Sequence, residues 1–180
     1  YLTEQMAIAR RDLDYIESVL EELDRAETEQ DFLDIRGELR DAGFLRRQGK
    51  KEQNRPAKPL EFRTTSGFRV LVGRNNRQND KLTKSAGPRD IWLHTQKIHG
   101  SHVILWLEGG GADARSLTEA AQLAAYFSQA RDGKKGPVDY TPVKYVKKPA
   151  GARPGMVVYS TYQTAVVDPD PELAKRLRVK

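Results

Sequence analysis

The sequence predicts an α+β protein, in which an N-terminal helical coiled-coil segment precedes a compact mixed α/β domain with a mainly antiparallel sheet. Three patterns lead to this fold class. Apolar residues near the N-terminus recur at alternating spacings of four and three, which is typical of a helix that packs along a seam. Short stretches of alternating apolar and polar residues follow, separated by glycine and proline, and they indicate strands joined by tight turns. The apolar run Val-Ile-Leu-Trp-Leu at 103–107 is typical of a strand that is covered on both faces.

Changes in composition divide the chain into four segments. We expect a helical coiled-coil segment over residues 1–45, a basic linker over 46–58, the mixed domain over 59–168 and a basic C-terminal tail helix over 169–180. With 180 residues, of which 38% are hydrophobic, the chain can bury one core and carry an appendage. Because it begins at Tyr1 and not at Met, we expect it to be part of a longer protein.

The net charge of +6 hides an asymmetry between the ends of the chain. Residues 1–45 contain 13 acidic and 5 basic side chains, a net of −8, which leaves +14 for the remaining residues. A basic body of this kind favours a polyanionic partner such as RNA or DNA. The sequence has no run of eighteen apolar residues and no N-terminal signal, so we expect a cytoplasmic protein without membrane contact. It has no cysteine, which excludes disulfides and thiolate chemistry.

The first helix is predicted from a seam with a 3.5-residue period. We interpret it as one half of a coiled-coil hairpin whose other half precedes Tyr1, and we expect that the exposed seam could also pair two copies of the chain. The alternative is a helix that folds back on its own body. The seam residues are Leu2, Met6, Ala9, Leu13, Ile16, Leu20 and Leu23.

A second helix is predicted from Thr28, with Asp31 completing a capping box and Gly43 ending the helix. After the linker, apolar alternation around Thr-Ser-Gly at 65–67 predicts a short hairpin. The polar segment 74–80 then leads into a brief helix, which either Asn79 or Asp80 would cap. Amides and guanidinium groups near a helix N-terminus suit a phosphate. The alternative for 74–80 is an Asn-rich turn.

The stretch 89–107 predicts two strands joined at Gly100. In the first strand Asp90, Trp92 and His94 share one face, since side chains alternate with a period of two. His102 opens the second, covered strand. If the ring of Trp92 is partly exposed, it can stack on an unpaired base beside a carboxylate and a histidine. The alternative is that these side chains form a structural hydrogen-bond network.

The remainder predicts a helix, strands and a tail helix. The glycine-rich loop 108–114 lacks the Lys-Ser/Thr ending of a phosphate-binding loop, and a capping box at Ser116 and Glu119 starts a helix that runs to about 131. Strands follow at 138–146, with a final hairpin at 156–159 and 164–167. Lysines beside tyrosines in 140–148 suit phosphate and base stacking, or else they blunt a solvated sheet edge.

We expect neither an enzyme nor a metal site. Asp90 could orient His94 as a general base, but no nucleophile is evident. His94, His99 and His102 are the only histidines, and the sequence shows no carboxylate cluster at ligand spacing beside them. No cofactor is indicated.

Four motifs, taken together, carry a family resemblance. They are Gly-Arg-Asn-Asn-Arg-Gln-Asn-Asp at 73–80, Asp-Ile-Trp-Leu-His at 90–94, Gly-Ser-His at 100–102 and Asp-Tyr-Thr-Pro-Val-Lys-Tyr-Val-Lys-Lys-Pro at 139–149. Over about 59–168 they resemble the RNA-binding domain of the NFACT family, and the acidic helices before them resemble the end of the family's middle coiled coil. One departure is Ile98-His99, where Ile-Pro is common in the family.

The resemblance implies a role in ribosome-associated quality control. The parent protein would bind a large ribosomal subunit obstructed by peptidyl-tRNA and recruit tRNA for C-terminal alanine tailing of the stalled chain. The partners implied are the large ribosomal subunit, tRNA and the other domains of the parent chain. The RNA-binding candidates are Arg74, Asn75, Asn76, Arg77, Asn79, Asp90, Trp92, His94, His102, Lys144, Tyr145, Lys147 and Lys148.

Two other functions remain open at this point. Some NFACT proteins carry the older name fibronectin-binding protein, which implies a surface adhesin whose basic body binds a host matrix protein. The other alternative is a protein-interaction scaffold that acts through the coiled-coil seam.

Overall fold

The computed structural model describes residues 1–46, 49 and 55–180 of the chain, so part of the predicted basic linker lies outside the described residues. The helices are α1 (Leu2–Arg25), α2 (Glu29–Asp41), α3 (Asn76–Ser85), α4 (Ala114–Tyr126) and α5 (Pro171–Leu177). The strands are β1 (Leu60–Arg63), β2 (Arg69–Val72), β3 (Ile91–Thr95), β4 (Val103–Leu105), β5 (Gly136–Pro142) and β6 (Gln163–Val167), and a 3-10 turn covers Val143–Tyr145. The predicted α+β class is therefore confirmed.

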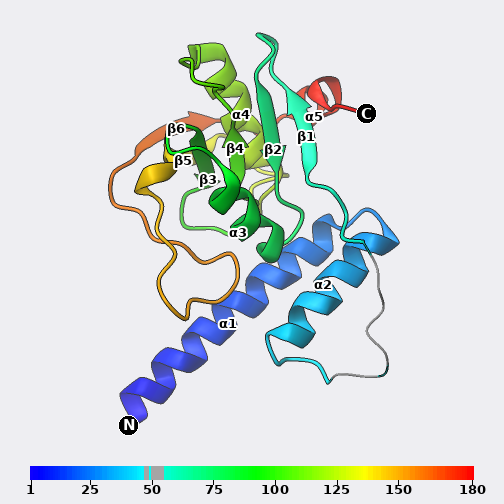
Figure 1. Cartoon of the computed structure of the whole chain (residues 1–180), viewed down its shortest axis with the longest axis vertical. Helices are drawn as coiled ribbons and strands as arrows, with labels where there is room; N and C mark the ends of the chain where they lie inside the picture. Colours follow the sequence, from blue (N-terminus) through cyan, green and yellow to red (C-terminus); the bar gives the residue numbers. More distant parts are fainter. Residues whose placement is uncertain (47–48, 50–54) are drawn as a thin grey trace.

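The six strands form one antiparallel sheet in the order β1-β2-β4-β3-β5-β6. Alternation along the strands builds a core on each face. Leu93 and Val103 face the larger core, which α4 and α5 cover. Trp92 and Ile104 face the smaller core together with Leu82 of α3. The sheet is thus covered on both faces, and Figure 1 shows α3 in front of it and α4 behind it.

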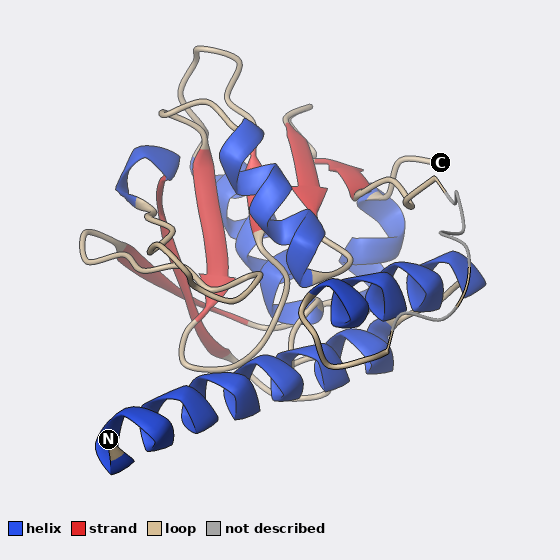
Figure 2. Cartoon of the chain, turned by 60° about the horizontal axis from the view of Figure 1, so that its bottom comes forward, coloured by secondary structure: helices blue, strands red, loops and turns tan. Residues whose placement is uncertain are grey.

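Helices α1 and α2 form an acidic arm, residues 1–45, that lies along one end of the sheet (Figures 1 and 2). The arm has its own small core around Tyr15, Val19 and Ile35. Thr28 and Asp31 make the predicted capping box. After α2, Gly43 adopts a φ of 87°, and Phe44 stacks on Tyr15 with ring centroids 5.6 Å apart. These contacts close the arm into a hairpin of two helices.

Most of the predicted seam of α1 is exposed, because α1 packs through a neighbouring face. Leu2, Met6, Leu13 and Leu20 are 76%, 56%, 60% and 56% exposed. Pairing of this seam with another helix stays a prediction. No helix among the described residues combines the length and the apolar character needed to span a bilayer.

Three local predictions were wrong. Helix α4 begins at Ala114 without a side-chain cap, since the Ser116 hydroxyl donates to Thr64 and the Glu119 carboxylate binds Thr65. Helix α3 is capped by Asn75, so it begins earlier than predicted. In place of the final hairpin, β6 pairs with β5, and segment 156–159 makes only an isolated bridge, Lys147 to Val158.

Candidate nucleic-acid interface

Asp90 ties two loops to the sheet. Its carboxylate accepts hydrogen bonds from the backbone N–H groups of Gly87 and Leu107, at 2.8 and 2.9 Å. Its backbone carbonyl accepts from the N–H of Val143, at 2.9 Å, at the start of the 3-10 turn. Asp90 is buried, so it fixes the ends of β3 and β4 and the segment that follows β5.

The ring of Trp92 is covered by other aromatic rings. His94 stacks on it at a centroid distance of 5.7 Å, Tyr159 packs at 4.7 Å and His102 meets it edge-on at 5.4 Å. Trp92 is only 1% exposed. The stacking prediction required a partly exposed ring, and that condition is not met in this structure.

Both candidate histidines of the central strands are held by backbone carbonyls. The ring of His94 contacts the carbonyl oxygens of Thr95 and Gly100, at 2.7 and 3.2 Å. The ring of His102 contacts the Gly155 carbonyl oxygen at 3.1 Å, and its backbone N–H donates to Asn79. Burial lowers the pKa of His94, and burial together with the nearby His94 lowers the pKa of His102.

The start of α3 does bind anionic groups, but these groups belong to the acidic arm. The backbone N–H of Arg77 donates to the carboxylate of Glu38 at 2.8 Å. The guanidinium of Arg74 lies 3.3 Å from Asp31, and that of Arg77 pairs with Asp41. A helix N-terminus with two arginines was predicted to suit a phosphate, and here carboxylates from α2 fill that role.

The other RNA-binding candidates at the start of α3, Asn75, Asn76 and Asn79, also make hydrogen bonds within the protein. Asn76 is buried and donates to the hydroxyl of Ser18 in α1 at 2.9 Å. Other arm-to-body contacts join Arg25 to Ser101, Arg153 to Asp12 and Arg178 to Glu27. Part of the charge asymmetry between the two ends of the chain is thereby neutralised inside the molecule.

The segment after β5 presents exposed cations. We call residues 143–148 the basic edge; it comprises the gold 3-10 turn in Figure 1 and the three residues after it. Lys144, Tyr145 and Lys147 are exposed, and the Lys144 ammonium lies 5.0 Å from the centre of the Tyr145 ring. Lys148 is also exposed but pairs with Asp80 at 3.1 Å. An aromatic ring flanked by lysines suits stacking with a base and pairing with a phosphate.

A shallow cavity of about 480 Å³ extends the basic edge. Its lining includes Lys144, Arg89 and the glycines 109–111, which come from separate loops. Neither Arg89 nor the glycine-rich loop was among the RNA-binding residues predicted from the sequence. The sequence gives little indication that this loop and Lys144 share a surface, because the loop lacks a phosphate-binding motif and lies far from Lys144 in the sequence.

The fold and this edge define a class of protein: a small α+β module that carries exposed cations, as polyanion-binding domains typically do. The comparison with protein families is more specific. Residues 58–160 match the family described as NFACT protein RNA binding domain, and the chain belongs to the NFACT family, as the resemblance of its motifs indicated.

Individual relatives agree with this assignment. The chain is 41% identical over 181 residues to the Rqc2 homolog RqcH of Bacillus subtilis, a match that covers 97% of this chain and 31% of the relative. It is 38% identical over 172 residues to the Rqc2 homolog RqcH of Streptococcus pneumoniae D39, covering 94% and 31%. The chain therefore spans about a third of the length of these relatives.

A solved structure has the same fold along nearly the whole chain. It is the C-terminal part of the fibronectin/fibrinogen-binding protein from Streptococcus suis, which matches with a TM-score of 0.93 at 34% identity. The match covers 99% of this chain and 72% of that chain. The position of the arm against the sheet is thus shared with that protein.

Proposed function

We propose that this chain is a non-catalytic RNA-binding module of a ribosome-associated quality control factor. The observation that carries the proposal is the exposed basic edge in a chain that belongs to the NFACT family. Its expected partners are the large ribosomal subunit, tRNA and the other domains of the parent protein. The parent would act in the cytoplasm, where it would recruit tRNA for alanine tailing of stalled chains.

In this proposal Lys144 and Lys147 pair with phosphates, and Tyr145 stacks on an unpaired base. Each base stacked on an aromatic ring contributes about 1–3 kcal/mol. Arg89 and the glycines 109–111, beside Lys144, offer a second contact site for the sugar-phosphate backbone of the same RNA strand. The buried candidates Asp90 and Trp92 act indirectly: Asp90 accepts a hydrogen bond from the N–H of Val143, and Trp92 packs in the same apolar cluster as Val143 and Val146.

The experiment measures binding of this chain to purified large ribosomal subunits and to tRNA across a salt series. The variant Lys144→Ala/Lys147→Ala/Lys148→Ala is compared with the unchanged chain. Each lost phosphate contact is expected to reduce the slope of log K against log salt by about 0.7 for single strands. Because Lys148 is paired with Asp80, the expected reduction corresponds to about two contacts.

A matched control removes three lysines elsewhere. Lys134 and Lys135 precede β5, at the strand end opposite the basic edge, and Lys175 lies in α5. The variant Lys134→Ala/Lys135→Ala/Lys175→Ala has the same net charge as the test variant and is expected to keep most of the affinity. Equal losses in both variants would show attraction to total charge only, and no loss in either would move RNA recognition away from this edge.

A second candidate function follows from the solved relative named a fibronectin/fibrinogen-binding protein. In that case the basic body would bind an acidic segment of a host matrix protein. Saturable binding of fibronectin with an affinity above that for tRNA, measured on the same immobilised chain, would favour this candidate.

A further inference from the structure

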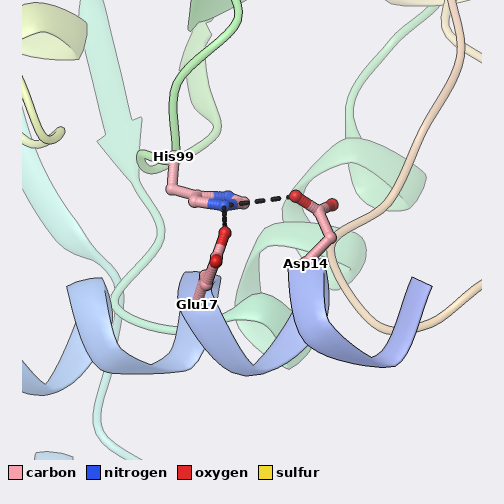
Figure 3. A group of neighbouring side chains, drawn as sticks. All are labelled: Asp14, Glu17 and His99. Atoms are coloured by element: carbon pink, nitrogen blue, oxygen red, sulfur yellow. Dashed lines mark ion pairs between the residues drawn. The ribbon is translucent and has the colours of Figure 1, made fainter. Parts of the chain in front are cut away.

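Three side chains that are far apart in the sequence converge between the arm and the body. Figure 3 shows Asp14 and Glu17 of α1 pointing toward the ring of His99, which comes from the loop between β3 and β4. The Nε2 atom of His99 lies 3.3 Å from Oδ1 of Asp14 and 3.8 Å from Oε2 of Glu17. One ligand atom from each of the three residues lies within 4.8 Å of the other two.

These distances suit a shared cation better than direct hydrogen bonds. An N–H···O bond normally spans about 2.7–3.2 Å, so the contact of His99 with Glu17 is too long for one and the contact with Asp14 is at the upper limit. Two ligands at about 2.0–2.2 Å from one tetrahedral metal ion lie roughly 3.3–3.6 Å apart. The separations of 3.3 and 3.8 Å from His99, with an Asp14–Glu17 separation of at most 4.8 Å, can close around an ion when the two exposed carboxylate side chains rotate.

The loop that carries His99 is fixed, so the imidazole is held in place before any ion binds. The backbone N–H of His99 donates to the side chain of Gln129, and the backbone N–H of Gln129 donates to the His99 carbonyl, both at 3.0 Å. On the other side, Asp14 and Glu17 are three residues apart in α1, which brings both carboxylates to one helix face. The His99 side chain is 21% exposed, against 50% and 54% for the carboxylates.

We propose that Asp14, Glu17 and His99 form a binding site for a divalent transition-metal ion, with Zn²⁺ as the preferred ion, that clamps the acidic arm to the body. One imidazole nitrogen and two carboxylate oxygens are ligands that Zn²⁺ accepts, whereas Mg²⁺ and Ca²⁺ prefer oxygen alone. The two carboxylates supply the charge that a divalent ion needs. Three protein ligands leave at least one position for water.

The coordination position left for water would face a cavity on the side of the sheet domain. All three residues line a cavity of about 500 Å³ whose lining also includes His94 and His102. Those two rings are held by backbone carbonyls, so they contribute no obvious ligand nitrogen. The clamp is therefore made by α1 and one loop. Among the described residues it is the one group of three or more candidate ligands that meets in this way.

The test uses the untagged 180-residue chain after treatment with a chelator. Calorimetry with ZnCl₂ is expected to give one ion per chain with a micromolar dissociation constant. At a hundredfold excess over that constant, Zn²⁺ is expected to raise Tm by about 5–10 °C. Equal concentrations of Mg²⁺ or Ca²⁺ are expected to leave Tm unchanged.

Variants locate the ion. His99→Ala is expected to weaken Zn²⁺ binding at least tenfold, and so is the nearly isosteric double change Asp14→Asn/Glu17→Gln, which keeps the shape of α1. Asp24→Asn removes an exposed carboxylate elsewhere on α1 and is expected to bind Zn²⁺ as the unchanged chain does.

Two results would overturn the proposal. Unchanged Zn²⁺ affinity in both site variants would place the ion elsewhere. A lower Tm of metal-free His99→Ala, without any Tm increase by Zn²⁺ in the unchanged chain, would reduce the cluster to a simple ion pair. Neither result depends on RNA binding, so the two proposals can fail separately.

Discussion

Two cationic segments of the same domain have opposite surroundings. At the start of α3, Arg74 and Arg77 face the carboxylates of α2, and a backbone N–H of that helix end binds Glu38. In the basic edge, Lys144 and Lys147 project into solvent. The first segment uses its positive charge to hold the arm on the body, while the second leaves its charge available to a partner.

The difference between these two segments shows that the number of cationic residues does not predict how many of them can bind a partner. Paired arginines cannot release counterions from RNA until their carboxylate partners leave, whereas exposed lysines can do so at once. Stability should therefore respond to changes at buried contacts, and RNA affinity to changes at the basic edge. Three pairs of variants test this division.

The largest effect on stability is expected from the aromatic cluster that supports the basic edge. Trp92→Ala removes a buried ring and should lower the free energy of unfolding by about 3–5 kcal/mol. Tyr145→Ala removes an exposed ring of the basic edge and should change it by less than about 0.5 kcal/mol. Urea denaturation followed by far-UV circular dichroism measures both. Similar losses would mean that the two rings do not differ in role.

A second effect is expected inside the arm. Glu22 is buried, and its oxygens make no well-formed hydrogen bond with any described residue. Burial, together with the neighbouring Glu38, raises the pKa of Glu22 well above its ordinary value. The folded state then holds the proton more tightly than the unfolded state. This contribution to stability is complete below the unfolded pKa of about 4.3 and decreases as pH rises toward the folded pKa.

Replacing Glu22 with glutamine should remove that decrease. We expect Glu22→Gln to raise the free energy of unfolding at pH 7.5 by about 1–3 kcal/mol, because the amide keeps the shape of the side chain but has no charged form to desolvate. Tm measured between pH 5 and pH 8.5 should fall less with pH than in the unchanged chain. Some pH dependence should remain because burial also raises the pKa of Glu38. Glu4→Gln on the exposed end of α1 is the matched control, and an equal gain there would point to net charge instead.

The sequence predicted most features that depend on neighbouring residues, although it placed the cap of α3 at Asn79 or Asp80 whereas Asn75 makes it. The capping box of Thr28 and Asp31 is made within one turn of the chain. The alternation that places Trp92 and Leu93 on opposite faces of the sheet follows from strand geometry alone. The fold class followed because such local signals recur along the whole chain.

Features that depend on distant partners were missed. Ser116 and Glu119 match a capping box in the sequence. In the structure, however, the Ser116 hydroxyl donates to Thr64, and the Glu119 carboxylate accepts from Thr65. Nothing near Arg74 in the sequence indicates that its partner is Asp31. The same limit hid the cluster of His99 with two carboxylates of α1, since its members come together only when the arm packs on the body.

The smallest effect on stability is expected from a variant that makes the start of α3 resemble the basic edge, because it leaves a cation there without its carboxylate partner. Asp41→Asn removes the exposed partner of Arg77 and should change the free energy of unfolding by no more than about 1 kcal/mol. The freed guanidinium should increase affinity for tRNA about two- to threefold at low salt, and the salt slope should become steeper by up to about 0.7. Asp132→Asn, which removes an exposed carboxylate remote from α3, controls for net charge. If both variants gain equally, the start of α3 is a structural joint only; if Asp41→Asn gains alone, the arm covers a surface that RNA can use.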